Sequence, residues 1–428
     1  SMKRDDSSND TEKSVIIEVE RDSLDEKIEV KLISIGKKAK IKGFRPGKIP
    51  KSVLRKYHGS EAYQDAISDL IQDGYTEAIK ESDFNPISSP NIKPIESKND
   101  KLRFEAKFEI LPDIELKGLD KISISRPDVK ITPKDMDNML EKLRKQKRKW
   151  KKIDTKSVEG NQINIDFIGK LKGETFSGGE GKDVNIILGE KQMIPDFEKA
   201  LFGLKSGDTK SFKVKFPKDY HSEELSGKKV DFDLTVNSLE EEVLPEIDKE
   251  FVKEFGIEDG SIDKLKEDVT RNMKRELRHK INQDIKNQVM HGLLENNDIP
   301  IPVSMRENEI KNMQKESMRQ MGIKDENDMP PAENFTDMAE KRVKLGLLIS
   351  KYIEDKALKV DQEKVKKHIE DMFAGYQEPD KLIEQYMGNQ QIMGQIQSMV
   401  LEDQAFDLIA KEGKEKSNKI SFSEYMNH

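Results

Sequence analysis

The 428-residue sequence contains no cysteine, which excludes disulfide bonds, thiolate metal ligands and a cysteine nucleophile. Its six histidines lie far apart, and no nucleotide-binding or hydrolase motif is present, so we expect neither a metal nor a cofactor. No apolar run approaches the roughly 20 residues that span a bilayer. The polar start SMKRDDSSND lacks the apolar core of a secretory signal. These absences predict a cytoplasmic protein that has no contact with a membrane.

Charged residues dominate what is present, at 37% against 34% hydrophobic residues, with a formal net charge of -7. The length alone suggests several domains. Changes in composition and hydrophobic pattern along the chain predict a multidomain α+β protein. The predicted parts are a disordered segment (1–13), an α+β domain (14–112), a linker that packs on the C-terminal part (113–152), a small antiparallel β domain with a short helix (153–242) and a helical domain (243–428).

The first domain shows both helical and strand patterns. SVIIEVE and LRFEAKFEIL alternate as strands do, and Leu24, Ile28, Leu32 and Ile35 recur at helical spacing. Pro50 suits the first turn of a short helix, and EAYQDAISDLIQDGYTEAIKE predicts another helix after it.

Two stretches concentrate positive charge in this acidic chain. Residues 36–56 hold nine basic residues and no acidic one, with Gly-Phe-Arg-Pro-Gly at the centre. This loop is either a solvated turn or a contact for a polyanion, because each phosphate contact releases counterions. The other stretch is EKLRKQKRKWKK at 141–152, with eight basic residues against one acid. A solvated linker helix is the favoured interpretation, and a nucleic-acid contact is the alternative.

Aromatic residues are dispersed through the β domain, where most would be expected to form the core. Their setting is more specific: IDFIGKLKGETFSGG, LGEKQMIPDFEKALFGLKSGD, FPKDYH and VDFDLTV follow one another at short spacings. This combination resembles the FKBP-type prolyl isomerases. The resemblance implies an isomerase whose proline pocket is lined by Phe167, Phe176, Met193, Ile194, Phe197, Tyr220 and Phe232. Ser177 stands where single-domain relatives often have Asp, which bears on macrolide binding rather than on isomerisation.

The basic loop carries a second resemblance. GFRPGKIP, from Gly43 to Pro50, is similar to the ribosome-docking motif G-F-R-x-G-x-x-P of bacterial trigger factors. The similarity implies that the loop binds the ribosome through Gly43, Phe44, Arg45, Gly47 and Lys48. Pro46 stands where some members of the family have Lys, so one cation of that patch is absent.

The helical region begins with VLPEIDKEFVKEFGIEDGSIDKLKEDVTRNMKREL, which resembles the start of the trigger factor C-terminal domain. The resemblance covers essentially the whole chain in the same domain order. It implies an ATP-independent chaperone beside the exit tunnel of the large ribosomal subunit, in contact with ribosomal protein and rRNA. Its clients would be nascent and unfolded chains, and it would also isomerise X-Pro bonds.

Methionines are concentrated in the same region, with thirteen of the 17 between Met273 and Met426. Flexible, polarisable methionines suit surfaces that accept varied apolar partners. We expect Met313, Met318 and Met321 to contact clients, although any single methionine is more often part of a helix–helix seam.

Two other functions remain open on the sequence. One is a free-standing isomerase with helical dimerisation arms, which would not need the basic loop. The other is an RNA-binding ribosome-assembly factor that uses both basic stretches. A homodimer of the chaperone away from the ribosome is also possible.

Overall fold

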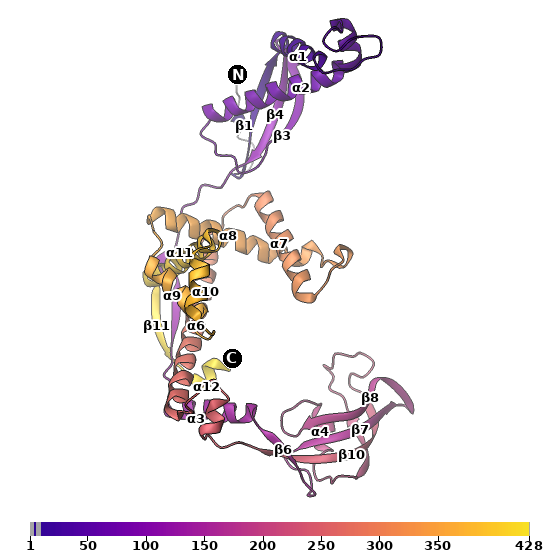
Figure 1. Ribbon diagram of the computed structural model, residues 1–428, viewed down its shortest axis with the longest axis vertical. Coiled ribbons are helices and arrows are strands. Elements are labelled where there is room, and N and C mark those ends of the chain that lie inside the picture. The colour runs from indigo at the N-terminus through magenta and orange to yellow at the C-terminus, as the bar shows by residue number, and fades with distance from the viewer. Residues whose placement is uncertain (1–3, 6–9, 428) are drawn as a thin grey trace. The chain divides into compact units, whose positions relative to one another are not determined.

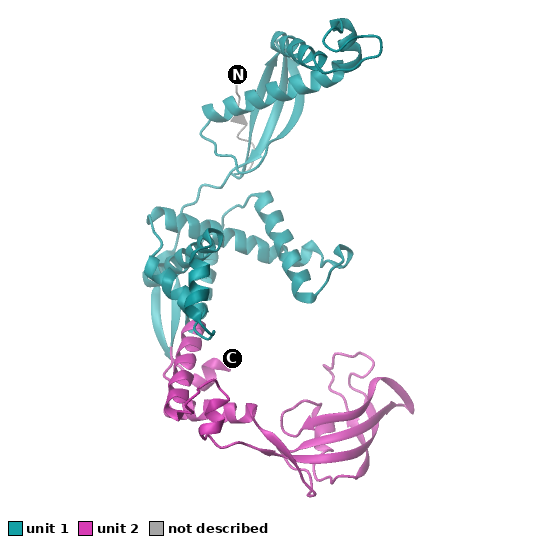
Figure 2. Cartoon of the chain, in the orientation of Figure 1, with its two compact units in different colours: residues 1–127, 281–418 teal, residues 128–280, 419–428 magenta. Residues whose placement is uncertain are grey.

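The structure is a computed structural model that describes residues 4–5 and 10–427 (Figure 1). The chain divides into two compact units (Figure 2). Residues 1–127 and 281–418 form the first unit, and residues 128–280 and 419–428 form the second. Each unit therefore combines segments that are far apart in the sequence.

The N-terminal module of the first unit is an antiparallel sheet packed against two helices (Figure 1). Val15, Ile17 and Val19 alternate along the sheet's second strand and are buried with Ala66 and Ile67 of the long helix, because alternate side chains share one face of a strand. The strand order is β1-β2-β4-β3, and the elements are β1 (Arg4–Asp5), β2 (Glu12–Glu20), α1 (Arg21–Gly36), α2 (Lys51–Glu81), β3 (Asn91–Lys98) and β4 (Lys101–Glu109).

Two details of this module differ from the sequence-based expectation. Part of the segment 1–13, expected to be disordered, is strand: Arg4 pairs with Val15 in β1, and β2 already begins at Glu12. The rest of the expected disorder, residues 1–3 and 6–9, lies outside the described residues. The two helices expected after Pro50 are one, because α2 continues through Gly59 without a break.

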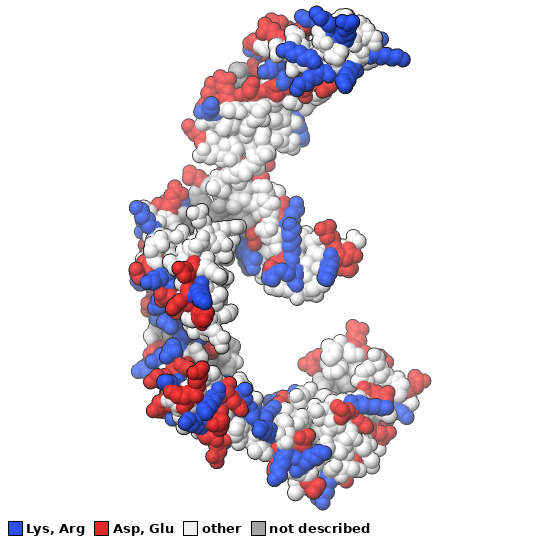
Figure 3. All heavy atoms as spheres, viewed as in Figure 1, with Lys and Arg blue, Asp and Glu red and all other residues white. Residues whose placement is uncertain are grey.

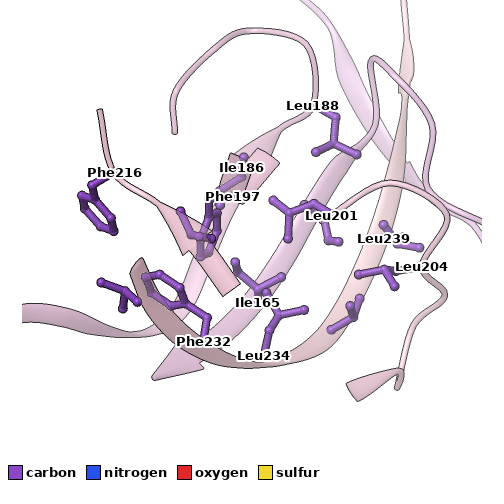
Figure 4. Close-up of a cluster of buried hydrophobic side chains, with 14 of the residues drawn as sticks. Ile165, Ile186, Leu188, Phe197, Leu201, Leu204, Phe216, Phe232, Leu234 and Leu239 are labelled. Carbon is purple, nitrogen blue, oxygen red and sulfur yellow. The ribbon is translucent and has the colours of Figure 1, made fainter. Parts of the chain in front are cut away.

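The β module of the second unit is a five-stranded antiparallel sheet that packs one short helix against its inner face. Its strands follow the order β6-β10-β7-β8, and β9 pairs with β10. The inner face holds a single large hydrophobic cluster, part of which Figure 4 shows. The elements are β6 (Lys149–Lys152), β7 (Gln162–Leu171), β8 (Glu174–Ile187), α4 (Pro195–Lys199), β9 (Thr209–Lys215) and β10 (Lys229–Val243).

The second basic stretch is not the continuous helix that we expected. Helix α3 ends at Gln146, and Lys149–Lys152 form strand β6 on the end of β10. The register places Lys151 opposite Glu241 and Lys152 opposite Glu240. Opposite charges on facing strand positions attract each other, so carboxylates of the same chain already face these lysines. This arrangement weakens the case for a nucleic-acid contact there.

The remaining elements are mainly helical, and α6 continues from the second unit into the first. In the second unit they are α3 (Pro133–Gln146), α5 (Lys249–Lys253), the start of α6 (Ile262–Asn296) and α12 (Phe422–Met426). In the first unit they are α7 (Val303–Met321), α8 (Thr336–Asp355), α9 (Gln362–Met372), α10 (Pro379–Met387) and α11 (Gln390–Glu412), with strands β5 (Ser123–Asp128) and β11 (Lys414–Lys419) paired at the boundary. None of the described helices combines the length and the apolar character that a membrane crossing requires.

The main helical core of the first unit includes a piece of the segment between the N-terminal and β modules. Ile122 and Ile124 are buried in one cluster with residues of α6, α8 and α11. The fit is close, because a Cβ atom added at Gly413 would lie 2.4 Å from the Ile122 carbonyl oxygen. The backbone N–H of Lys414 donates to that same oxygen at 2.8 Å. Position 413 therefore requires glycine because the backbone of Ile122 lies too close for a Cβ atom, and not because of an unusual φ angle.

This contact predicts that Gly413→Ala destabilises the helical domain by about 1–3 kcal/mol, as overpacking of a well-filled core does. Gly394→Ala is the control within α11, the helix that Gly413 caps, since nothing lies within 4 Å of its added Cβ. Alanine in that exposed helical position is expected to stabilise the domain by about 0.5–1 kcal/mol. Urea unfolding followed by far-UV circular dichroism measures both. Equal midpoints for the two variants would contradict the packing account.

Candidate functional sites

Three of the seven residues expected to line the proline pocket form one group of rings in the β module. The ring centroid of Phe197 lies 5.4 Å from that of Phe167 and 5.0 Å from that of Phe232, both edge to face. Phe167 and Phe232 lie 6.0 Å apart. Such edge contacts are favourable between aromatic rings. Figure 4 shows Phe197 and Phe232 side by side at one end of the cluster.

The local sequence explains how these rings come together. Phe167 is on β7 and Phe232 on β10, where Phe232 pairs with Gly169. A Cβ atom at Gly169 would lie 2.7 Å from the Phe232 ring, and one at Gly181 would lie 2.5 Å from the Phe167 ring. The two glycines therefore provide the space in which the rings lie. Pro195 opens α4 at a first-turn position that suits proline, and Phe197 follows it with only 1% of its surface exposed.

The other four expected pocket residues are half-buried and pack against the same cluster. They are Phe176, Met193, Ile194 and Tyr220. The Tyr220 ring meets Phe216 edge to face at 4.9 Å and His221 at 4.2 Å. All seven residues thus belong to one hydrophobic cluster, with Phe197 at its base and the four half-buried side chains nearer the solvent.

Sequence reasoning did not assign Phe212 to the site. Its ring stacks on Phe232 at 5.8 Å and meets Phe197 at 5.5 Å. The alternation in KSFKVKF places Phe212 on the same face as Val214 and Phe216, which could have identified it.

A groove of about 500 Å³ also opens on this module, and of the seven expected residues only Phe167 contributes to it. Its lining carries several charged and hydroxyl side chains: Asp166, Glu180, Lys182, Thr209, Lys210, Ser211, Asp233 and Thr235. A proline ring is apolar, so the aromatic cluster suits it better than this groove does.

The aromatic cluster can act on a peptide bond without an acid, a base or a nucleophile. Rotation about that bond costs about 18–20 kcal/mol because resonance stiffens it. The twisted transition state loses resonance and part of the amide dipole, so apolar walls disfavour it less than they disfavour the planar form. A pocket of rings therefore lowers the barrier by differential binding. Among the described residues, no group of three His, Cys, Asp or Glu side chains is placed to hold a metal ion.

The basic loop between α1 and α2 is anchored at both ends and exposed at its tip. Ile41 and Ile49 pack in a small cluster with Leu32 and Leu54, which fixes the base of the loop. Gly43 and Gly47 have φ angles of 94° and 82°, a region that favours glycine. Between them the Phe44 side chain is 41% exposed, so its ring is accessible to a partner.

The cations of this loop are available to a partner. Lys37, Lys38, Lys40, Lys42, Arg45 and Lys48 form no ion pair with any residue in the described part of the chain. The cations that follow the loop differ, because Lys51 and Arg55 both contact Glu29. Figure 3 shows Lys and Arg gathered at the end of the N-terminal module where the loop lies. The loop thus presents one exposed ring within a field of unpaired positive charge.

The three methionines expected to contact clients are not equivalent. Met313 is only 8% exposed and packs with Ile310 and Ala339 between α7 and α8, so it is a seam residue, contrary to the expectation. Helical periodicity explains the difference, since Met313 shares the buried face of α7 with Ile310 three residues earlier. Met318 is half-buried, and Met321 is 65% exposed at the end of α7. Sequence reasoning missed Met338 on α8, which is also exposed.

Comparison with known protein families agrees with this division into modules. The family described as "Bacterial trigger factor protein (TF)" matches residues 2–143, and its C-terminal counterpart matches residues 261–411. The family described as "FKBP-type peptidyl-prolyl cis-trans isomerase" matches residues 154–237, which lie within the β module. The matches leave few residues of the chain uncovered.

Curated relatives and a solved structure extend the likeness to the full length. The trigger factor of Colwellia psychrerythraea is 38% identical over 420 residues, covering 97% of each chain, and that of Idiomarina loihiensis is 39% identical over 419 residues, covering 97% of this chain and 96% of its own. A solved structure from work on "Promiscuous Substrate Recognition in Folding and Assembly Activities of the Trigger Factor Chaperone" has a TM-score of 0.51 at 20% identity, covering 96% of this chain and 100% of that chain. The predicted fold class and enzyme class are therefore confirmed. The chain belongs to the bacterial trigger factor family, the ribosome-associated chaperones that carry an FKBP-type peptidyl-prolyl isomerase domain.

Proposed function

We propose that this chain docks on the large ribosomal subunit near the exit tunnel through the loop Gly43, Phe44, Arg45, Gly47 and Lys48. The observation that carries the proposal is the exposed Phe44 ring among cations that have no ion pair in the described part of the chain. The cations suit rRNA phosphates, and the ring suits an apolar patch on a ribosomal protein. Family membership supports ribosome binding in general, and the loop specifies the surface.

The aromatic cluster is the isomerase site in this proposal. Phe167, Phe197 and Phe232 form the floor, and the half-buried Phe176, Met193, Ile194 and Tyr220 form the walls. The Tyr220 hydroxyl has no hydrogen-bond partner among the described residues, which leaves it able to donate to a substrate carbonyl. We assign this activity to residues 153–242, ribosome docking to 14–112, client holding to 243–428 and a supporting role to the linker 113–152.

Clients are nascent and unfolded chains, held without ATP in the cytoplasm by many weak apolar contacts. Two exposed methionines of α7 and α8, Met321 and Met338, contribute to this surface together with the half-buried Met318, and Met313 supports it from the seam. Each contact is worth about 1 kcal/mol. Linked contacts still hold a chain, because each one raises the effective concentration for the next.

Sedimentation of the full chain with purified ribosomal subunits tests the docking part. We expect the chain to pellet with the large subunit and not with the small one, and to be released as the salt concentration rises. Binding to naked rRNA fragments with the same affinity would favour the assembly-factor alternative, and no binding at low salt would favour the free-standing isomerase. Sedimentation equilibrium of the chain alone tests the homodimer that we include in this proposal.

The methionine assignment makes a separate prediction. Met318→Ser with Met321→Ser should weaken the suppression of aggregation of a denatured client by about threefold, through the loss of apolar area. Helix content should be unchanged, because Met321 is exposed and Met318 only half-buried. Met313→Ser is the comparison, and it should lower the unfolding midpoint of α7 and α8. Light scattering and circular dichroism measure the two effects, and unchanged holding by the double variant would contradict the assignment.

A further inference from the structure

Arg148 stands in the turn between α3 and β6, within the basic stretch that the proposed function leaves unused. Its Nη1 atom donates to Glu242 Oε2 at 2.9 Å and to Glu190 Oε1 at 3.2 Å. Glu242 is on the end of β10, whereas Glu190 belongs to the loop between β8 and α4. One guanidinium thus joins two separate parts of the β module.

The surroundings of Arg148 make its bond to Glu242 firmer than an ordinary surface ion pair. Its guanidinium lies 4.8 Å from the ring centroid of Trp150, the one tryptophan in the sequence. Only 22% of the Arg148 side chain and 23% of the Glu242 side chain are exposed. Burial alone would lower the pKa of the Arg148 guanidinium, but the bonds to Glu242 and Glu190 outweigh it, and the pKa lies above its ordinary value.

The loop that Glu190 belongs to carries two walls of the proposed pocket, Met193 and Ile194. Side chains fasten the loop at three places. The Gly189 N–H donates to Glu198 Oε1 at 2.5 Å, and the Ile187 N–H donates to Gln192 Oε1 at 2.8 Å. Those two bonds link neighbouring residues of the loop and its flanking elements. The Arg148–Glu190 contact spans 42 positions in the sequence. Because Arg148 also bonds to Glu242 of β10, this contact fixes the loop to a distant strand and not to its own neighbours.

We propose that Arg148 is a positioning residue for the isomerase, holding the loop 189–194 against the end of β10 so that Met193 and Ile194 form one wall of the proline pocket. The inference rests on the proposed pocket. It also implies that a functional isomerase module begins at Arg148 and not at residue 153, where the β domain was expected to start. Nη1 contacts both carboxylates while the guanidinium lies over the Trp150 ring, a combination that the compact lysine ammonium does not reproduce.

The kinetic consequence follows from what the loop does. A loosened wall weakens the binding of the substrate and of the twisted transition state alike, because both contact the same apolar side chains. Such a loss raises KM and leaves kcat nearly unchanged. A change in the floor of the pocket, by contrast, is expected to lower kcat.

Steady-state isomerisation of a short proline peptide by the full chain tests this expectation. Arg148→Lys and Glu190→Gln should each lower kcat/KM by about three- to fivefold, mainly through KM, on the scale of a partly exposed ion pair. The double variant should lose no more than either single one, since both remove the same contact. Lys151→Met is the matched control, because it removes a nearby exposed cation whose register partner is Glu241 and not a residue of the loop. The kcat/KM of this control variant should stay within about 1.5-fold of the wild-type value.

Trp150 fluorescence gives a second readout. It should respond to peptide only if Arg148 positions the loop, and not if Arg148 merely stabilises the fold. Binding of a proline tetrapeptide should change the Trp150 emission in the wild type, because Arg148 contacts both the loop, through Glu190, and the Trp150 ring. Glu190→Gln should abolish the change while the folded spectrum remains. Tyr220→Ala separates the two proposals: if it retains full activity, the pocket assignment fails. If it loses activity while the Arg148 and Glu190 variants keep wild-type KM and the peptide-induced emission change, the positioning role is overturned.

Discussion

Tyr220→Ala is expected to lower kcat/KM for a short proline peptide by about 10- to 100-fold without unfolding the protein. The substitution removes an aromatic ring, whose burial by substrate contributes about 1.5–3 kcal/mol to binding. It also removes the hydroxyl that can donate a hydrogen bond to the substrate. Tyr220 is half-buried at the rim of the cluster, so its removal leaves the floor intact. A protease-free assay of cis–trans relaxation, followed over a range of peptide concentrations, separates kcat from KM.

The choice of Tyr220 follows from burial. Phe197 belongs to the same aromatic cluster, but it is almost completely buried and its ring contacts three other rings. Phe197→Ala is expected to cost about 3–5 kcal/mol of stability, so lost activity would not distinguish a pocket from a core. Phe202→Ala is the matched control, since Phe202 is an exposed aromatic on the same module. Equal activity of the Tyr220 and Phe202 variants would refute the pocket assignment.

Phe44→Ala combined with Arg45→Ala is expected to weaken binding to the large ribosomal subunit at least tenfold. Both side chains are exposed at the loop tip, and the base of the loop is held by Ile41 and Ile49, so the fold should not change. The single variants should differ in kind. Loss of Arg45 should reduce the slope of log affinity against log salt by about one if it contacts a phosphate. Loss of Phe44 should lower the affinity at all salt concentrations by a similar factor.

A control for the double variant removes the same residue types elsewhere. Tyr376→Ala with Lys381→Ala takes away an exposed aromatic and an exposed cation of the helical domain. Its affinity for vacant ribosomes should equal that of the wild type. If this control and the loop variant bind equally well, the docking surface is not the loop from Gly43 to Lys48.

Much of this architecture could be predicted from local sequence. Short stretches of sequence indicate the alternating strands β2 and β4 and the glycine-containing loop. They also give the order of the segments around Phe167, Phe197, Tyr220 and Phe232. These stretches determine local backbone geometry and which face is apolar. The domain order follows from such changes along the chain, whereas the pocket residues of the aromatic cluster were implied only by the resemblance to FKBP-type isomerases.

What could not be predicted depends on pairing across long sequence separations. Nothing local to EKLRKQKRKWKK shows that Lys149–Lys152 would leave the helix to pair with β10, because the facing carboxylates are about ninety residues away. The same holds for Ile122, which becomes core only when α6 and α11 close around it. Burial of Met313 depends likewise on how α8 packs on α7, and sequence periodicity gives only the face it shares.

In the proposed function, one chain docks by the basic loop and holds a nascent chain on helices α7 and α8. The most direct measurement places a photo-crosslinking amino acid at the exposed Met321 and adds the full chain to ribosomes stalled with a nascent chain. We predict a crosslink to the nascent chain that falls at least tenfold when Phe44→Ala and Arg45→Ala are also present. A crosslink of equal yield with the loop variant, or no crosslink with the intact loop, would contradict the account.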